Sequence, residues 1–276
     1  KYSDRVALTQ RVADHTWVPT TWQVLHQHVN DAAAALETLG ISEQEHIGIF
    51  SNNRVGIIET DLAAYANRAI PVSIYSTSSK EQVEYIVCDA AISLLLVGDQ
   101  QQYDIARKVA KSCGRLRQIV TVEEVRRDDD DDTTMTFAQL LDLGRHASQM
   151  CRDEVARRTA AARPDDVATL IYTSGTTGEP KGAILPHSAF DAAIKIHVER
   201  LTMLSEHDTS LCFLPLSHIF EKAWTYFCLY CGMIVNVNPD PHIIQRAIKE
   251  VRPSCMCSVP RFWEKVYTAI DEKLSQ

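Results

Sequence analysis

Apolar and polar residues alternate along this chain with the periods of helices and strands. The first clear helix runs from Leu25 to Leu36, where apolar side chains recur three and four positions apart. The residues Thr20-x-x-Gln23 form a capping-box pattern ahead of it, and Gly40 follows as a helix stop. We therefore expect an amphipathic helix between Thr20 and Gly40.

Short apolar runs alternate with amphipathic segments through the rest of the chain. The run Ile92–Val97 (ISLLLV) is almost wholly apolar, which is typical of a strand in a sheet that is covered on both faces. We expect further strands at residues 46–50, 70–75, 118–122, 167–173, 210–214, 233–237 and 255–259. We expect further helices at residues 55–67, 104–112, 186–204, 219–231, 241–251 and 261–274, after the capping box Ser79-x-x-Gln82, and within 135–163. This order predicts an α/β fold of layered βα subdomains with mainly parallel sheets.

Composition narrows the class of protein. The 276 residues include 28 lysines and arginines and 36 aspartates and glutamates, which gives a net charge of −8. Hydrophobic residues make up 45% of the chain, so there is enough apolar material for a core and disorder is excluded for the bulk of it. The acidic balance argues against a nucleic-acid partner. The most apolar stretch, residues 223–237, is shorter than a membrane span, so we expect a soluble, cytoplasmic protein.

Five consecutive aspartates interrupt the pattern within Arg126–Thr134 (RRDDDDDTT). Like charges at this density repel one another and resist burial, so we expect a solvated loop. A cation site is the alternative. It would need carboxylates that converge from a defined loop, which a bare run does not supply, and we expect no metal ligands in this chain.

The eight cysteines do not suggest a disulfide scaffold in a chain of this length. Most lie in apolar surroundings, so we expect buried free thiols in a reducing compartment. A metal site formed by Cys228-x-x-Cys231 and Cys255-x-Cys257 is the alternative, but this spacing matches no zinc pattern.

Glycines are scarce but clustered. Of the ten in the chain, Gly175, Gly178 and Gly182 fall within the segment TSGTTGEPKG, directly after an apolar strand. Glycines let backbone N–H groups turn toward an anion, four hydroxyls add donors, and Lys181 adds a positive charge. These groups together on a loop after a strand are suited to holding a polyphosphate. The alternative, a plain surface turn, would explain the glycines and Pro180 but not the hydroxyls and the lysine.

The spacing excludes two common phosphate-binding loops. The order here is G-x-x-G-x-x-K-G, whereas a Walker loop needs G-x-x-x-x-G-K-[ST] and a dinucleotide fingerprint needs G-x-G-x-x-G. The segment instead resembles, from Leu170 to Lys181, the phosphate-loop signature of the adenylate-forming superfamily. That superfamily includes acyl-CoA synthetases, luciferases and peptide-synthetase adenylation domains.

Two further segments are similar to the long-chain fatty acid–CoA ligase branch of this superfamily. Phe213–Glu221 (FLPLSHIFE) matches the LPLSH(I/V)(F/Y)E segment, and Ser258–Tyr267 (SVPRFWEKVY) matches the VPRxWEK segment. The resemblance covers essentially the whole chain. It implies the α/β fold of the N-terminal domain of adenylate-forming enzymes.

The resemblance also implies an activity. In that family a fatty acid carboxylate attacks the α-phosphate of ATP, pyrophosphate leaves with Mg²⁺ neutralising charge, and coenzyme A, the co-substrate, then displaces AMP. The residues expected to hold the β- and γ-phosphates are Thr173, Ser174, Gly175, Thr176, Thr177, Gly178 and Lys181. His218 is expected to line the acyl and adenylate pocket; without the resemblance, a lone histidine that ends a strand would be taken as structural. Aromatic residues after it could line a lipid tunnel, but for each of them the core is favoured.

Other family elements have no counterpart in this sequence. They are a Tyr-Gly-x-Thr-Glu segment that helps hold ATP and magnesium, a ribose-binding aspartate, and a hinge to a small domain that carries a catalytic lysine. We therefore expect residues 1–164, with the acidic loop 126–134, to form a first subdomain. Residues 165–276 would form a second, which carries the phosphate loop and is incomplete at its C-terminal end.

Three functional hypotheses remain open at this stage. The first is a parent long-chain fatty acid–CoA ligase of which this fragment alone is inactive. The second is an adenylating enzyme for a different carboxylate, and the third is a non-enzymatic ATP- or lipid-binding module. Fatty acyl substrates make peripheral membrane contact conceivable, although no basic amphipathic anchor is evident. No motif in the sequence indicates the preferred acyl chain length or the oligomeric state.

Overall fold

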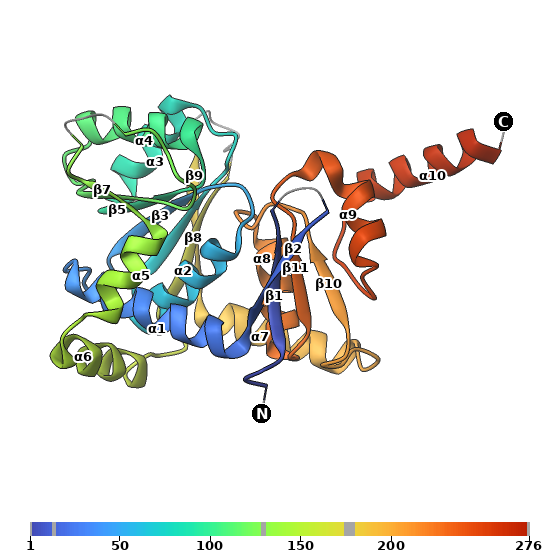
Figure 1. Ribbon diagram of the computed structural model, residues 1–276, viewed down its shortest axis with the longest axis horizontal. Coiled ribbons are helices and arrows are strands. Elements are labelled where there is room, and N and C mark those ends of the chain that lie inside the picture. Colours follow the sequence, from blue (N-terminus) through green and yellow to red (C-terminus); the bar gives the residue numbers. More distant parts are fainter. Residues whose placement is uncertain (1, 13–14, 128–130, 174–179, 275–276) are drawn as a thin grey trace.

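Two sheets form the frame of the molecule (Figure 1). The computed structural model describes residues 2–12, 15–127, 131–173 and 180–274. Within them, the larger sheet has, in spatial order, β7 (Thr134–Thr136), β6 (Gln118–Thr121), β5 (Leu94–Val97), β3 (His46–Phe50), β4 (Ile70–Ile74), β8 (Val167–Thr173) and β9 (Lys181–Pro186). The smaller sheet has β10 (Thr209–Cys212), β11 (Ile234–Val237), β1 (Val6–Arg11) and β2 (Trp17–Thr21).

Both sheets are mainly parallel, as the sequence predicts. The antiparallel pairs are β8–β9 at one edge of the larger sheet and β1–β2 at one edge of the smaller sheet. The other described pairs, such as β4–β8 and β10–β11, are parallel. The helices that connect them are α1 (Trp22–Thr38), α2 (Val55–Ala66), α3 (Lys80–Asp89), α4 (Gln100–Ser112), α5 (Phe137–Arg145), α6 (Gln149–Ala160), α7 (His187–Arg200), α8 (Ile219–Tyr230), the short 3-10 helix η1 (Pro241–Ile243), α9 (Ile244–Val251) and α10 (Pro260–Leu274).

Strand β5 shows why its sequence is apolar throughout. Leu94 and Leu96 belong to the core that α1, α2 and α5 cover, whereas Leu95 and Val97 belong to the core under α3 and α4. Successive side chains of a strand point to opposite faces, so a strand with helices on both sides needs apolar residues at consecutive positions. The predicted double-sided cover of this strand is confirmed.

The two sheets share one hydrophobic core. Ile47 of β3, Ile58 of α2, Phe227 of α8 and Val235 of β11 belong to the same buried cluster. Helices α2 and α8 thus lie where the two sheets approach each other (Figure 1). Helix α10, by contrast, projects away from the body of the molecule (Figure 1).

Glycine makes one close helix contact possible. A Cβ added at Gly144 of α5 would lie 1.6 Å from the backbone oxygen of Asp31 in α1. Helices α1 and α5 therefore pack backbone to backbone at this point, and a larger residue would force them apart.

Several local predictions are corrected by the structure. The first helix is capped by Thr21, whose side chain accepts a hydrogen bond from the Val24 N–H, and not by Thr20. The stretch 135–163 forms two helices and not one, because a capping box at Thr136 starts α5 and Ser148 caps α6. Strands β1, β2, β7 and β9 were not predicted, because β7 has only 3 residues and the side chains of β1, β2 and β9 do not alternate regularly between core and solvent.

The predicted strand at 255–259 was also wrong. In the described part of the chain this segment makes only an isolated parallel bridge between Ser210 and Cys255. Pro253 and Pro260 flank the segment, and proline has no N–H to donate to a neighbouring strand, so little length is left for a hydrogen-bonded ladder.

Cysteine pairing differs from the expectation of free thiols. Cys88 at the end of α3 and Cys113 at the end of α4 form a disulfide, with a Cα–Cα distance of 5.9 Å. The other six cysteines are free, as expected. The two helices lie side by side on the same face of the larger sheet, and this packing, invisible in the sequence, brings the pair together.

The acidic run is only partly solvated. Asp132 is exposed, but the Asp131 side chain is fully buried, accepts a hydrogen bond from the Tyr103 hydroxyl at 2.6 Å and pairs with Arg107 at 3.2 Å. An adjacent guanidinium offsets the cost of burying one carboxylate. Residues 128–130 of the run lie outside the described residues.

The sheets do not divide at the proposed boundary between residues 1–164 and 165–276. Strands β8 and β9 join the larger sheet beside β4, while β1 joins the smaller sheet beside β11. The chain crosses between the sheets more than once, so the division into two subdomains stays a proposal about folding units.

Candidate functional site

Parallel strands from both sheets end at a common junction. A small cavity of about 50 Å³ there is lined by residues that follow the carboxyl ends of β3, β4, β10 and β11. These residues are Ser51, Asn52, Asn53, Ser76, Phe213, Pro215, Asn238, Pro239 and Pro241. Ligands of open α/β sheets bind beyond the carboxyl ends of the strands, so a ligand-binding site is expected at this edge.

A larger cleft of about 490 Å³ opens at the same edge beside β4 and β8. Its lining includes Thr173 at the end of β8 and Pro180 just before β9. The other lining residues follow β4 or belong to α3 and β8, namely Tyr75, Thr77, Ser78, Gln82, Ile86 and Tyr172. The cleft therefore borders the segment predicted to hold phosphate.

The β8–β9 hairpin brings two of the predicted phosphate ligands together. Thr173 and Lys181 are directly paired across the antiparallel strands, and both are exposed. The loop between them carries the other predicted ligands, Ser174, Gly175, Thr176, Thr177 and Gly178, which lie outside the described residues. A hydroxyl and an ammonium group at the loop end of the hairpin fit the phosphate groups of ATP.

Tyr172 and Gly182 shape the base of this hairpin. They are paired across the strands, and a Cβ added at Gly182 would lie 3.2 Å from the Tyr172 ring. The Tyr172 hydroxyl donates to the Asp89 carboxylate of α3 at 2.5 Å, and burial together with this carboxylate raises the pKa of Tyr172. The last glycine of the signature thus makes room for a tyrosine that ties the strand to α3.

His218 lies beyond the smaller sheet, at the end of the loop that joins β10 to α8. It is exposed and caps α8, where its Nδ1 accepts a hydrogen bond from the Phe220 N–H at 3.2 Å. No hydrogen bond in the described part of the chain joins it to Thr173 or Lys181. Both predicted regions nevertheless sit beyond carboxyl ends of parallel strands, at β8 and at β10.

Glu221 is a buried acid to which the sequence assigns no chemistry. It has no exposed surface, and its Oε2 accepts hydrogen bonds from the Leu214 N–H at 3.0 Å and from the Cys257 thiol at 3.3 Å. Burial raises the pKa of Glu221 to about 7, against hydrogen bonds that favour the ionised form. This carboxyl group fixes the start of the loop that leads to His218.

The aromatic residues after His218 are mostly core. Trp224 and Phe227 are buried in the shared cluster, as expected, and the Trp224 ring N–H donates to Ser210 at 2.9 Å. Phe220 is 45% exposed, so the preference for core was wrong at that position.

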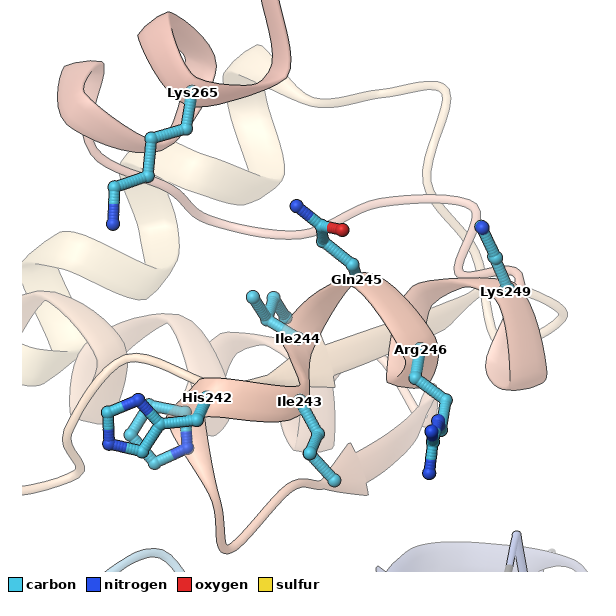
Figure 2. A pocket seen from close by; sticks show the side chains of 8 residues that line it. His242, Ile243, Ile244, Gln245, Arg246, Lys249 and Lys265 are labelled. Carbon is cyan, nitrogen blue, oxygen red and sulfur yellow. The ribbon is translucent and has the colours of Figure 1, made fainter. Parts of the chain in front are cut away.

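A separate cavity of about 570 Å³ lies between α9 and α10 and is rich in basic side chains. Figure 2 shows Lys249 on one side of α9 and Arg246 on the other, while Lys265 reaches down from α10. These positive groups do not converge on one point, so we assign no ligand to this cavity.

Metal ligands do not gather in the described part of the chain. No group of three or more histidine, cysteine, aspartate or glutamate side chains there could hold a metal ion. Magnesium in nucleotide sites is commonly bound through one or two carboxylates and the substrate phosphates. The described residues thus fit ATP phosphates but do not form a protein cage for magnesium.

Within the described ranges, every helix is too short or too polar to cross a bilayer.

Known proteins are similar to this chain over nearly its whole length. The profile of a family described as AMP-binding enzyme matches residues 1–276. Long chain acyl-CoA synthetase 3 of Arabidopsis thaliana is 28% identical over 270 residues, which cover 94% of this chain and 39% of the relative. Long-chain-fatty-acid–CoA ligase FadD15 of Mycobacterium bovis is 30% identical over 264 residues, which cover 95% of this chain and 42% of the relative.

Solved structures confirm the fold. A long-chain-fatty-acid-CoA ligase, FadD1 from Archaeoglobus fulgidus, superposes with a TM-score of 0.79 at 19% identity, over 99% of this chain and 52% of that one. The predicted α/β class with mainly parallel sheets is therefore correct. The chain spans about two fifths of the length of the curated relatives it matches.

Proposed function

Because this chain belongs to the AMP-binding enzyme family, we propose that its parent protein activates long-chain fatty acids with ATP. The acid would become an acyl-adenylate, and coenzyme A would then displace AMP to give the thioester. The observation that carries this proposal is the hairpin that places Thr173 opposite Lys181 at the ends of the glycine-rich loop.

The hairpin would act by holding the triphosphate. Thr173, Lys181 and the hydroxyls and amides of residues 174–178 would bind the β- and γ-phosphates, so that the α-phosphate faces the attacking carboxylate. Fixed donors aimed at the leaving pyrophosphate stabilise its charge as it develops and require no reorganisation during the reaction. Mg²⁺, when bound with ATP, would neutralise further negative charge.

Long-chain acids are the substrates we favour within the family. Two segments, Phe213–Glu221 and Ser258–Tyr267, support this choice. They resemble the long-chain branch of the superfamily and not the branches that activate aryl acids or amino acids. We also propose that His218 lines the acyl side of the site. Its exposure beyond the end of β10 leaves it accessible to a ligand.

Residues 1–276 alone contain no Tyr-Gly-x-Thr-Glu segment, and in the family that segment helps hold ATP and magnesium. We therefore propose that this part of the protein does not complete adenylation by itself.

A screen of carboxylic acids tests the proposed activity. The full-length protein is incubated with ATP, Mg²⁺ and coenzyme A, and AMP release is followed with short, medium and long fatty acids, aryl acids and amino acids. We expect release with long-chain acids such as palmitate. Release with aryl or amino acids alone would indicate a different carboxylate, and ATP binding without release for any acid would indicate a binding module.

A further inference from the structure

Asn53 joins the two sheets at the loop that leads to His218. It lies in the turn after β3 of the larger sheet and is only 6% exposed. Its Nδ2 donates to the Leu214 carbonyl at 2.7 Å, and its Oδ1 accepts from the Leu216 N–H at 2.9 Å. Leu214 and Leu216 follow β10 of the smaller sheet, so one side chain bridges the junction where strands of both sheets end.

The chemistry of the position fits asparagine closely. The loop offers a carbonyl and an N–H two residues apart, and a side-chain amide supplies the matching donor and acceptor in one plane. The contacts are buried, so removing the amide would leave polar backbone groups without partners. Leucine has a similar size but neither group, and aspartate has only the acceptor.

A second buried group holds the same loop from the opposite direction. Glu221 of α8 accepts from the Leu214 N–H, while Asn53 takes the Leu214 carbonyl. Both backbone polar groups of Leu214 are therefore hydrogen-bonded, its N–H to Glu221 and its carbonyl to Asn53. The N–H of Leu216 is held by Asn53 as well. Ser217 and His218 come next along the chain, so His218 projects from a loop that is held at two of the four preceding residues.

We propose that Asn53 is a positioning residue that sets the place of His218 for the acid substrate, a role that rests on the proposed function. In the described part of the chain the hydrogen bonds of Asn53 go to Cys212, Leu214 and Leu216, and not to β8 or β9. Loss of Asn53 therefore acts on the acid side of the reaction and spares ATP binding at the β8–β9 hairpin.

Asn67 provides a matched control. It is also a buried asparagine whose Nδ2 donates to a backbone carbonyl, that of Ala33, at 2.6 Å. It follows α2 and precedes β4, so it lies at the amino ends of the strands, away from the junction. Asn67→Leu removes a comparable set of hydrogen bonds without touching the loop.

The test compares Asn53→Leu with Asn67→Leu in the full-length protein. We measure kcat/KM for palmitate, KM for ATP, and amide hydrogen exchange of peptides that cover residues 213–218. For Asn53→Leu we expect faster exchange at Leu216 and a loss of roughly tenfold or more in kcat/KM for the acid, with KM for ATP changed by less than about twofold. Asn67→Leu is expected to change none of these. If Asn53→Leu does not fold, Asn53→Asp, which keeps the acceptor for the Leu216 N–H and loses the donor to the Leu214 carbonyl, takes its place. It is expected to lower kcat/KM for the acid with KM for ATP changed by less than about twofold, and this kinetic difference, without the exchange at Leu216, then decides the outcome.

The outcomes separate this inference from the proposed function. Unchanged exchange at Leu216, or equal effects of the two leucine variants on the acid and on ATP, would overturn the positioning role while activity of the unaltered protein stands. No acid-dependent AMP release by the unaltered protein would overturn the proposed function and with it the catalytic part of the inference. The exchange result would then still decide whether Asn53 holds the loop.

Discussion

Glu221 shows how one residue type acquires its properties from its surroundings. The carboxyl group has no exposed surface and lies among the thiols of Cys212 and Cys257, whose pKa values burial also raises. A pKa of about 7 means that the folded protein holds a proton that the unfolded chain releases near its ordinary value of 4.5. The two thiols stay neutral throughout this range, so Glu221 titrates alone among them.

This difference predicts a pH-dependent stability. Between about pH 4.5 and pH 7 the native state binds more protons than the unfolded state, so stability falls as the pH rises through this window. Glu221→Gln keeps an acceptor for the Leu214 N–H and removes the titration. From urea unfolding at about pH 5 and about pH 8, we expect the unaltered protein to lose about 2 kcal/mol more than the variant does. An equal fall in the free energy of unfolding for both proteins would show that folding does not raise the pKa of Glu221, and it would contradict this prediction.

At the residue scale, some roles could be predicted from the sequence and others could not. The glycine-rich loop can be predicted as a phosphate site because glycines, hydroxyls and a lysine occur together in a short segment. Asn53, in Asn52-Asn53-Arg54, carries no such local pattern, because its partners lie more than 150 positions away along the chain, with a separation of 161 to Leu214. Glu221 also carries no local signal, because its raised pKa depends on burial that no sequence pattern reveals.

Helices α2 and α8 are joined by a buried ion pair at the contact between the sheets. Lys222 of α8 lies 2.7 Å from the Asp61 carboxylate of α2, and each side chain is only 1% exposed. The Tyr226 hydroxyl donates to the same carboxylate oxygen at 2.8 Å. Burying two charges is costly, and removing one of them leaves the other uncompensated.

A pair of variants tests this contact. Lys222→Met is expected to lower the free energy of unfolding by about 3–5 kcal/mol, because the buried Asp61 carboxylate is left without the ammonium group that it pairs with. Adding Asp61→Asn should recover part of this loss, since the amide is neutral and still accepts from Tyr226. The exposed pair Lys195–Asp191 of α7 is the control, and Lys195→Met is expected to change stability by less than about 1 kcal/mol. Equal losses for the two lysine variants, measured by urea unfolding, would contradict this account.

Helices and strands whose apolar residues recur with a clear period were predicted well, and elements in which this period is weak were not. The apolar strands β3, β4, β5 and β8 and the capped helix α3 agree with the prediction to within two residues. Strands β2 and β9 are largely exposed edge strands, so their side chains do not alternate between core and water. The segment 255–259 carries apolar residues but has only one bridge partner, because pairing is decided by neighbours and not by composition.

At the scale of the whole molecule, alternation of strands and helices was enough to predict the fold class. It was not enough to assign strands to sheets, because β1 and β8 each pair across the proposed subdomain boundary. That pairing brings the carboxyl ends of β3, β4, β10 and β11 to one junction. The β8–β9 hairpin and the His218 loop thus lie at one edge of the molecule, a proximity that the sequence implied only through its resemblance to the family.

The central claim is that the glycine-rich loop binds the phosphates of ATP for adenylation of a fatty acid. ATP–pyrophosphate exchange with palmitate measures this step directly, and we compare the full-length protein with its Lys181→Met variant. Lys108→Met, at an exposed lysine of α4, serves as the control. We expect acid-dependent exchange in the unaltered protein and the control, a loss of roughly 100-fold in Lys181→Met, and no exchange by residues 1–276 alone. Exchange that is absent from the full-length protein with every fatty acid, or that is unaffected by Lys181→Met, would contradict the account.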